Sequence, residues 1–221
     1  MSVTLGEEIM LLSLDDESGV AKERQSAGWA VAGGTLLELV MAGRVSVDGG
    51  RIAVTGTEST GTGLLDEQLR LIAVWAAKRR KPPKVTEWLT RDQSKAVRAT
   101  IESLRERGLV GEEQHKVLGV FPVRRFPEAD GAVERELRDR LSRVVLHGEE
   151  PDARSAGLIA LIHAAKLHRL AFPDLPKGKV SPRMEEVMEG QWAGESVRTA
   201  IRTMQAAMVA VTVATAVTVI G

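Results

Sequence analysis

Apolar residues recur at helical spacing along most of this chain. The motif TLGE at residues 4–7 is a capping box in front of the apolar run IMLLSL, which predicts the start of a first helix. Residues 26–42 predict a largely buried second helix, and Gly43 follows it where helices commonly end in a left-handed residue. The same spacing predicts further helices at about residues 65–76, 91–107, 131–147 and 154–170.

Two segments alternate apolar and polar residues in the manner of paired strands. In RVSVDGGRIAV, residues 44–54, valine and isoleucine alternate on both sides of the turn signal Asp48-Gly49-Gly50. The segment LVGEEQHKVLGVFPVRRF, residues 109–126, predicts a second extended or hairpin unit. The pattern therefore predicts a mainly α fold, in which residues 1–221 form a single compact helical domain with two small β-hairpins.

The tail from Met204 to Gly221 contains no charged residue and reaches the lower limit of length for a membrane span. Gln205 and three threonines interrupt it, and no aromatic or basic anchor follows. One helical stripe instead joins the larger side chains of this region: Val197, Ile201, Met204, Met208, Val211 and Thr215. We therefore predict a buried core helix, preceded by a loop in the segment PDLPKGKVSP, residues 173–182.

The amino-acid composition excludes some kinds of site but does not indicate a particular function. The chain has 30 Lys and Arg against 30 Asp and Glu, so its net charge favours no acidic partner, and any basic function must come from local clustering. It has no cysteine, which excludes disulfides and thiolate metal sites and suits a reducing cytoplasm. The first ten residues carry acids where a signal peptide needs positive charge, so we expect a cytoplasmic protein.

No motif for catalysis, cofactor or metal binding is complete. The loop GTESTGTG, residues 56–63, lacks the lysine that a phosphate-binding loop needs, and DDESG, residues 15–19, lacks the alternating acids of a calcium loop. His163 and His168 are five residues apart, which places them on different faces of one helix, so we expect a helix-surface role for both. We expect no enzyme activity, no cofactor and no metal.

The strongest local cluster of charge is KRRKPPK, residues 78–84, which contains Lys78, Arg79, Arg80, Lys81 and Lys84. Pro82 and Pro83 predict that this run is an extended surface loop. Each Lys or Arg near an anionic leaflet contributes about 1 kcal/mol, so five supply on the order of 5 kcal/mol. We predict that these five residues bind anionic phospholipid.

The second hairpin is a candidate for a further membrane contact. It combines an apolar tip with basic flanks, and the residues concerned are Val117, Leu118, Val120, Phe121, Arg124 and Arg125. An apolar element beside positive charge suits insertion into a lipid interface, and two weak signals anchor a protein better than one.

A DNA-binding regulator is the main alternative. The segment 91–126 has the order of a winged helix, in which a helix precedes a two-stranded wing that carries Arg124 and Arg125. Against this reading, the candidate recognition helix contains Asp92, Glu102 and Glu106, and the chain has no net positive charge. We therefore expect no nucleic-acid partner. A third reading is a scaffold that binds only protein and uses the hairpin to oligomerise.

Three stretches of the sequence resemble the Golgi phosphoprotein 3 family in order and spacing. They are GGTLLELVMAGRVSV (33–47), TGLLDEQLRLI (62–72) and ARSAGLIALIHAAKL (153–167). The resemblance implies a mostly helical single domain with a surface hairpin that serves membrane contact and self-association. It also implies an adaptor rather than a catalyst, because eukaryotic members bind phosphatidylinositol 4-phosphate and hold glycosyltransferases at the Golgi.

The family's headgroup pocket uses one tryptophan and three arginines. Placed on that pattern, the four pocket positions fall on or near Glu23, Ala32, Ala153 and Ala156. Arg24 and Arg154 each lie one residue from a pocket position, which makes them candidate lipid ligands of a shifted pocket. We therefore predict a peripheral membrane adaptor that binds anionic phospholipid without strong phosphoinositide selectivity, together with protein partners that the sequence does not identify.

Overall fold

The N-terminal capping box forms as the sequence predicts. In the computed structural model, which describes residues 3–15, 21–91, 93–117, 121–127, 129 and 131–220, helix α1 spans Leu5–Ser13. The Glu7 N–H donates to the Thr4 hydroxyl over 3.2 Å, and the Thr4 N–H donates to Glu7 Oε2 over 2.6 Å. All of α1 is buried, so this cap lies inside the protein and fixes where the chain enters the core.

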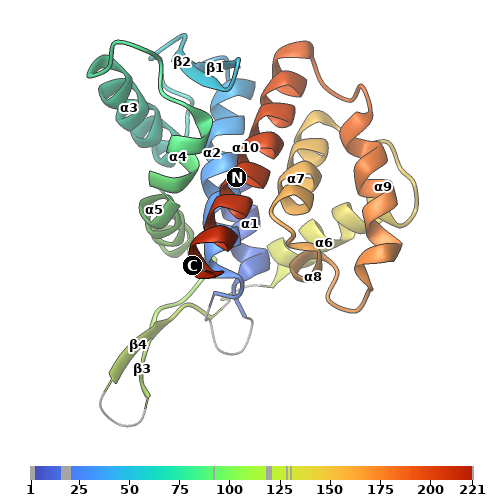
Figure 1. Cartoon of the computed structure of the whole chain (residues 1–221). Coiled ribbons are helices and arrows are strands. Elements are labelled where there is room, and N and C mark those ends of the chain that lie inside the picture. Colours follow the sequence, from blue (N-terminus) through green and yellow to red (C-terminus); the bar gives the residue numbers. More distant parts are fainter. Residues whose placement is uncertain are drawn as a thin grey trace.

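Helix α2, Arg24–Met41, is the central element, and α1, α3, α4, α5, α7 and α10 surround it (Figure 1). It is buried without interruption from Ala27 to Val40, so it forms the centre of the core. Close packing there depends on glycine. A Cβ at Gly33 would lie 2.6 Å from Met208 Cε and 2.9 Å from Leu161 Cδ2, so α7 and α10 can approach α2 only because Gly33 has no side chain.

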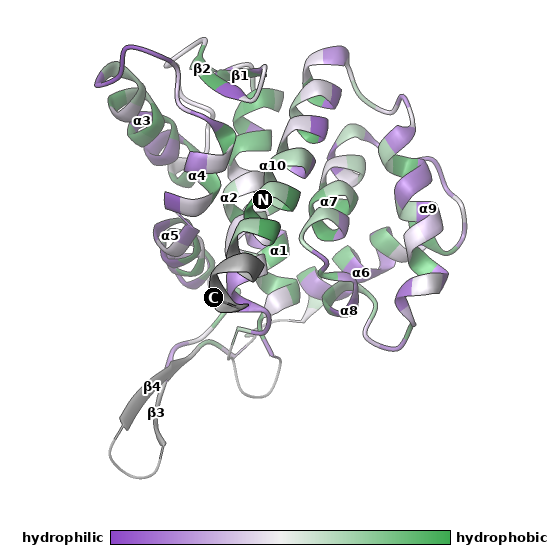
Figure 2. Ribbon diagram, in the orientation of Figure 1, coloured by the Kyte–Doolittle hydropathy of each residue, from purple (hydrophilic) through white to green (hydrophobic). Residues whose placement is uncertain are grey.

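The remaining helices complete the mainly helical fold that the sequence predicts. Their bounds are α3 Gly63–Ala77, α4 Val85–Arg91, α5 Gln93–Glu106, α6 Ala132–Val145, α7 Ala153–Ala164, α8 His168–Ala171, α9 Lys177–Glu189 and α10 Glu195–Ile220. Hydrophobic residues concentrate on the central helices α1, α2, α7 and α10, whereas the outer helices α5 and α9 carry many hydrophilic ones (Figure 2).

Both predicted hairpins are present. Strands β1, Val45–Asp48, and β2, Arg51–Val54, pair antiparallel with Asp48 opposite Arg51. Gly49 and Gly50 form the two-residue turn at φ +53° and +75°, which glycine adopts without strain. Strands β3, Glu113–Val117, and β4, Phe121–Arg125, form the second hairpin, which projects away from the helices (Figure 1).

Two predicted elements need correction, and one helix was missed. Helix α4 was not predicted, because its seven residues are too few to show a period. The helix predicted at 154–170 divides into α7 and α8, because Lys166 takes φ +60°. The predicted loop at 173–182 is wrong, since α9 begins at Lys177 and contains Pro182. Its buried side chains Val180 and Met184 lie on a face that packs against α7, and this packing overrides the proline.

The C-terminal helix α10 confirms the predicted core stripe as far as the structure describes its side chains. Met204 and Met208 are fully buried, Ile201 and Val211 are nearly so, and Val197 is half-buried. The side chain of Thr215 lies outside the described residues. Among the helices described, none is both long enough and apolar enough to cross a membrane.

Candidate functional site

The basic run KRRKPPK lies between α3 and α4 and is held against the first hairpin. The Ile52 N–H donates to the Pro83 carbonyl over 2.9 Å, and the Arg51 guanidinium donates to the Pro82 carbonyl over 2.6 Å. The Val85 N–H donates to the Gly50 carbonyl over 2.9 Å. Pro83 is buried while the cations around it are exposed, so the prolines fix the backbone and leave the charges in solvent, as the sequence predicts.

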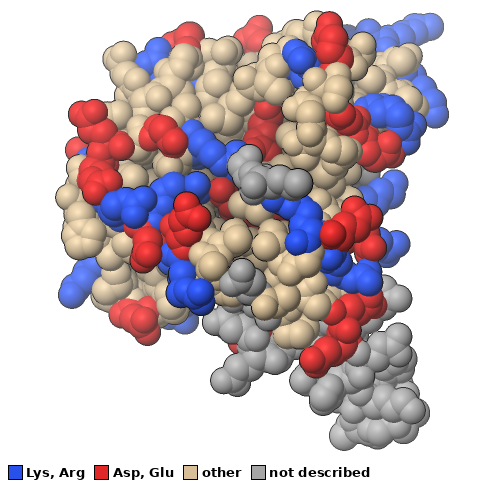
Figure 3. All heavy atoms as spheres, turned by 180° about the vertical axis from the view of Figure 1, so that it is seen from behind, with Lys and Arg blue, Asp and Glu red and all other residues tan. Residues whose placement is uncertain are grey.

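The five cations of this loop are not equivalent. Arg79 folds back on the protein: its Nη1 lies 2.6 Å from Glu87 Oε2 and its guanidinium lies 5.1 Å from the Trp75 ring centroid. Within the described part of the chain, the other four form no salt bridge, and all are exposed: Lys78, Arg80, Lys81 and Lys84. We use the name cationic loop for residues 78–84. Figure 3 shows Lys and Arg gathered on the side of the molecule where α3 and α4 lie.

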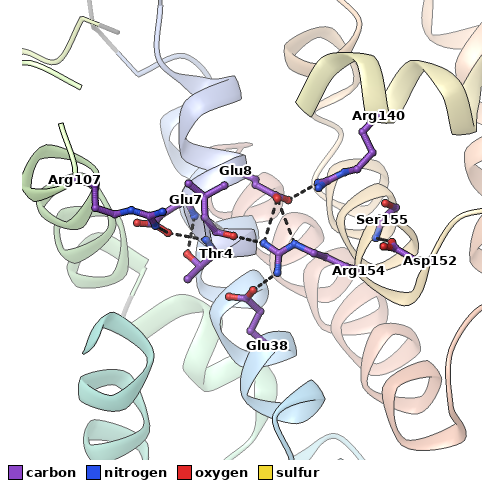
Figure 4. Close-up of polar contacts among 10 residues, drawn as sticks. Thr4, Glu7, Glu8, Glu38, Arg107, Arg140, Asp152, Arg154 and Ser155 are labelled. Atoms are coloured by element: carbon purple, nitrogen blue, oxygen red, sulfur yellow. Dashed lines mark hydrogen bonds and ion pairs between the residues drawn. The ribbon is translucent and has the colours of Figure 1, made fainter. Parts of the chain in front are cut away.

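Arg154 lies in a partly buried ion-pair cluster with two acidic side chains (Figure 4). Its Nη2 lies 3.1 Å from Glu8 Oε1, its Nη1 pairs with Glu38, and Nη2 also donates to the Val3 carbonyl. Arg140 approaches the second oxygen of Glu8 at 2.8 Å. The Glu8 and Glu38 side chains are only 3% and 10% exposed, so Arg154 supplies the charge that makes burial of both carboxylates tolerable.

The electrostatics of this cluster agree with a structural role. Burial by itself would lower the pKa of Arg154, but Glu8 and Glu38 outweigh it and raise the pKa further. Burial raises the pKa of Glu38 even though Arg154 opposes that shift. Asp152 caps the N-terminus of α7 by accepting the Ser155 N–H over 2.7 Å, which holds Arg154 in place at the start of that helix.

The structure does not bring the two predicted pocket arginines together. Arg24 is exposed at the first residue of α2, whereas the Arg154 guanidinium contacts Glu38 near the other end of the same helix. Fourteen residues of helix separate these points, which corresponds to about 21 Å. Of the family's pocket positions, Ala32 and Ala156 are buried and Glu23 is exposed with φ +49°.

The predicted hairpin residues can be placed only in part. Val117 ends β3, and Phe121, Arg124 and Arg125 belong to β4, but their side chains lie outside what the structure describes. Leu118 and Val120 lie outside the described residues altogether. The hairpin's backbone is therefore established, and its proposed membrane contact stays a prediction.

The two histidines form a pair that the spacing argument missed. Because the chain turns at Lys166, His168 Nε2 comes within 3.3 Å of His163 Nδ1, and His168 is buried rather than on a helix surface. Burial, followed by the neighbouring His163 and Lys177, lowers the pKa of His168 to about 4. Among the described residues, no three His, Asp or Glu side chains come together in a way that could hold a metal.

The fold and surface together define a mainly helical protein with an exposed cationic loop, in which the charges inside are paired. A family model described as Golgi phosphoprotein 3 (GPP34) matches residues 5–204 of this chain. The match covers nearly the whole sequence, so the chain belongs to the Golgi phosphoprotein 3 family, as the sequence motifs indicated. Comparison with individual curated proteins gives no match.

Proposed function

We propose that this protein attaches peripherally to membranes that contain anionic phospholipid, through the cationic loop, and binds protein partners there as an adaptor. The observation that supports the proposal is the contrast within the loop. Arg79 is paired with Glu87, but Lys78, Arg80, Lys81 and Lys84 are exposed and have no carboxylate within salt-bridge distance among the described residues. Charges left without an internal partner are available to phosphate groups outside the protein.

Four free cations, at about 1 kcal/mol each near an anionic leaflet, give about 4 kcal/mol. That corresponds to a dissociation constant on the order of 1 mM, which is too weak to hold a protein on a membrane alone. A second contact is therefore part of the proposal. The hairpin β3–β4 stands clear of the helices and is available for this contact, either with the lipid interface or with another copy of the chain.

Sedimentation with liposomes tests the proposal. The variant Lys78→Ala, Arg80→Ala, Lys81→Ala removes three cations without touching a buried residue. Its affinity for phosphatidylserine vesicles should fall about 100-fold, because about 3 kcal/mol is lost. The affinity of the parent should fall as salt is added, and that of the variant should depend less on salt.

A matched control removes three exposed cations from α8 and α9: Arg169→Ala, Lys177→Ala, Lys179→Ala. It should bind vesicles nearly as well as the parent does. Equal losses in the two triple variants, or equal binding of the parent to neutral vesicles, would refute the proposal. Tight binding of the parent to random duplex DNA, lost in the loop variant while vesicle binding persists, would instead support the DNA-binding alternative.

A further inference from the structure

A hollow of about 570 Å³ lies beside the cationic loop, where three separate segments meet. The turn between β1 and β2 and the first residues of α4 form one side, and α10 forms the other. Three cations from these segments line it: Arg51, Lys84 and Arg202. None of the family's headgroup positions is among the lining residues, so this hollow is distinct from the pocket that the family pattern describes.

The charge around this hollow is unbalanced. No Asp or Glu is among its lining residues, and within the described part of the chain none of the three cations forms a salt bridge. Many other described arginines pair with a carboxylate, among them Arg44, Arg70, Arg79, Arg105, Arg107, Arg138, Arg140, Arg154, Arg183 and Arg198. The exposed arginines without such a bridge among the described residues, such as Arg24, Arg98 and Arg169, do not line this hollow. Three like charges around one space repel each other unless an anion joins them.

The positions of two of the cations are set by the backbone around them. Arg51 donates from Nη1 to the Pro82 carbonyl, which anchors the guanidinium beside the hollow and leaves its other nitrogens available. Lys84 is fixed through its backbone, because Pro83 before it and Val85 after it both hydrogen-bond to the first hairpin. Arg202 is exposed on α10. The pKa of Glu195 is lowered mainly by Arg198, through a hydrogen bond and its charge, and Arg202 adds a smaller effect of the same sign.

The outer face of α10 continues from this hollow as an apolar stripe. Arg202, Ala206, Val209 and Val213 follow one another at helical spacing on the same face, and all are exposed. Val209 and Val213 are 56% and 58% exposed, the largest values among the large hydrophobic side chains described. Three cations therefore line the hollow and an apolar stripe borders it, which is an arrangement that a charged headgroup with acyl chains would fit.

We propose that this hollow binds a phosphomonoester, with Arg51, Lys84 and Arg202 as its ligands. A phosphomonoester carries nearly two negative charges at neutral pH and presents three acceptor oxygens, which suits two guanidinium groups and one ammonium. A phosphodiester carries only one charge and would leave the cations in excess. The ligand could be a lipid headgroup or a free phosphate compound, and the apolar stripe on α10 favours the lipid.

The lipid form of this proposal rests on the membrane attachment proposed above, whereas the phosphate site itself does not. The sequence predicts no strong phosphoinositide selectivity, because the residues of the family's headgroup pocket are replaced in this chain. A preference for phosphomonoesters would here come from residues outside that pattern.

The test uses Arg202→Gln, which removes one ligand from a solvent-exposed position and leaves the cationic loop unchanged. Arg169→Gln on α8 is the control with the same change of charge at another exposed site. Each protein is sedimented with vesicles of phosphatidic acid, a phosphomonoester, and with vesicles of phosphatidylserine matched to them in surface charge. Inorganic phosphate is titrated separately against the proteins in solution, with binding followed by calorimetry.

If the ligand is a lipid, the parent should prefer phosphatidic acid, and Arg202→Gln should lose that preference by about tenfold, as expected for one charged hydrogen-bonding group. Its binding to phosphatidylserine should change little. If the ligand is a free phosphate compound, neither vesicle is preferred, but the parent binds inorganic phosphate saturably and Arg202→Gln does not. The absence of both effects, or equal losses in the Arg169→Gln control, would overturn the site. Failure of membrane attachment alone would appear instead as a cationic-loop variant that binds vesicles as the parent does.

Discussion

Replacing Arg154 tests whether the buried ion-pair cluster is structural. Arg154→Met keeps most of the side-chain volume but leaves Glu38 without its cation, while Glu8 retains Arg140. Removing one partner of a buried pair typically costs 3–5 kcal/mol. Because one of the two carboxylates keeps a partner and the other can take up a proton, we expect the lower end, about 3 kcal/mol in the free energy of unfolding at neutral pH.

Urea unfolding followed by circular dichroism measures this change, with Arg70→Met as the matched control. Arg70 pairs with Glu67 at 2.6 Å, but both side chains are more than half exposed to solvent, so its loss should change the free energy of unfolding little. Adding Glu38→Gln to Arg154→Met should recover much of the stability, because the unpaired charge is gone. A loss below about 1 kcal/mol for Arg154→Met, together with weakened vesicle binding, would show that Arg154 is a lipid ligand instead.

The pH dependence of the same variant provides an independent check on the cause. Burial already raises the pKa of Glu38, and without Arg154 that pKa rises further. A carboxyl group whose pKa is higher in the folded than in the unfolded state favours folding more as the pH falls. The difference in stability between variant and parent should therefore narrow below neutral pH. A difference that stays constant with pH would point to lost packing rather than to an unpaired charge.

Two further predictions concern the core. His168 has a pKa of about 4 in the folded protein, below its unfolded value near 6.5. The stability that neutral His168 contributes is therefore present above pH 6.5 and is lost as the pH falls toward 4. When the free energy of unfolding is measured from pH 7 to pH 4, the parent should lose up to about 3 kcal/mol more than His168→Gln. Truncation before Met204 removes Met204, Met208 and Val211 from the core and should unfold the domain, since each contributes roughly 1.5–3 kcal/mol. If the protein truncated before Met204 stays folded and loses only membrane binding, the tail is a membrane anchor.

The sequence predicts those parts of the fold that local patterns determine. The capping box at Thr4, the helix up to Met41 and the turn at Gly49-Gly50 depend on neighbouring residues, and the structure confirms all three. Helix α9 was missed because its helical state depends on packing against α7, which outweighs the local signal of Pro182. The histidine pair was missed because the prediction placed both residues on one continuous helix. Lys166, with its positive φ, breaks that helix and brings the two rings together.

Among the candidate sites too, those formed by neighbouring residues could be predicted and those formed by distant residues could not. The cationic loop is contiguous in sequence, so its charges and their exposure to solvent could both be predicted. The cluster around Arg154 joins residues separated by 116 and 146 positions, so no local pattern indicates that this arginine is already paired. Arg51 and Arg202 were not singled out either, because neither belongs to a charge run and only the fold brings them to one hollow.

The zero net charge of the chain conceals how its charges are distributed. Most of the described arginines form salt bridges with carboxylates, and an arginine in such a pair attracts an external anion only weakly. The unpaired cations of the loop and the hollow lie together beside the first hairpin, which connects to both through Arg51. Local potential, not net charge, controls attraction to a charged surface within a Debye length. A protein with no net charge can therefore be attracted to an anionic membrane through one face, and the face that we propose for this contact is the one that carries the first hairpin.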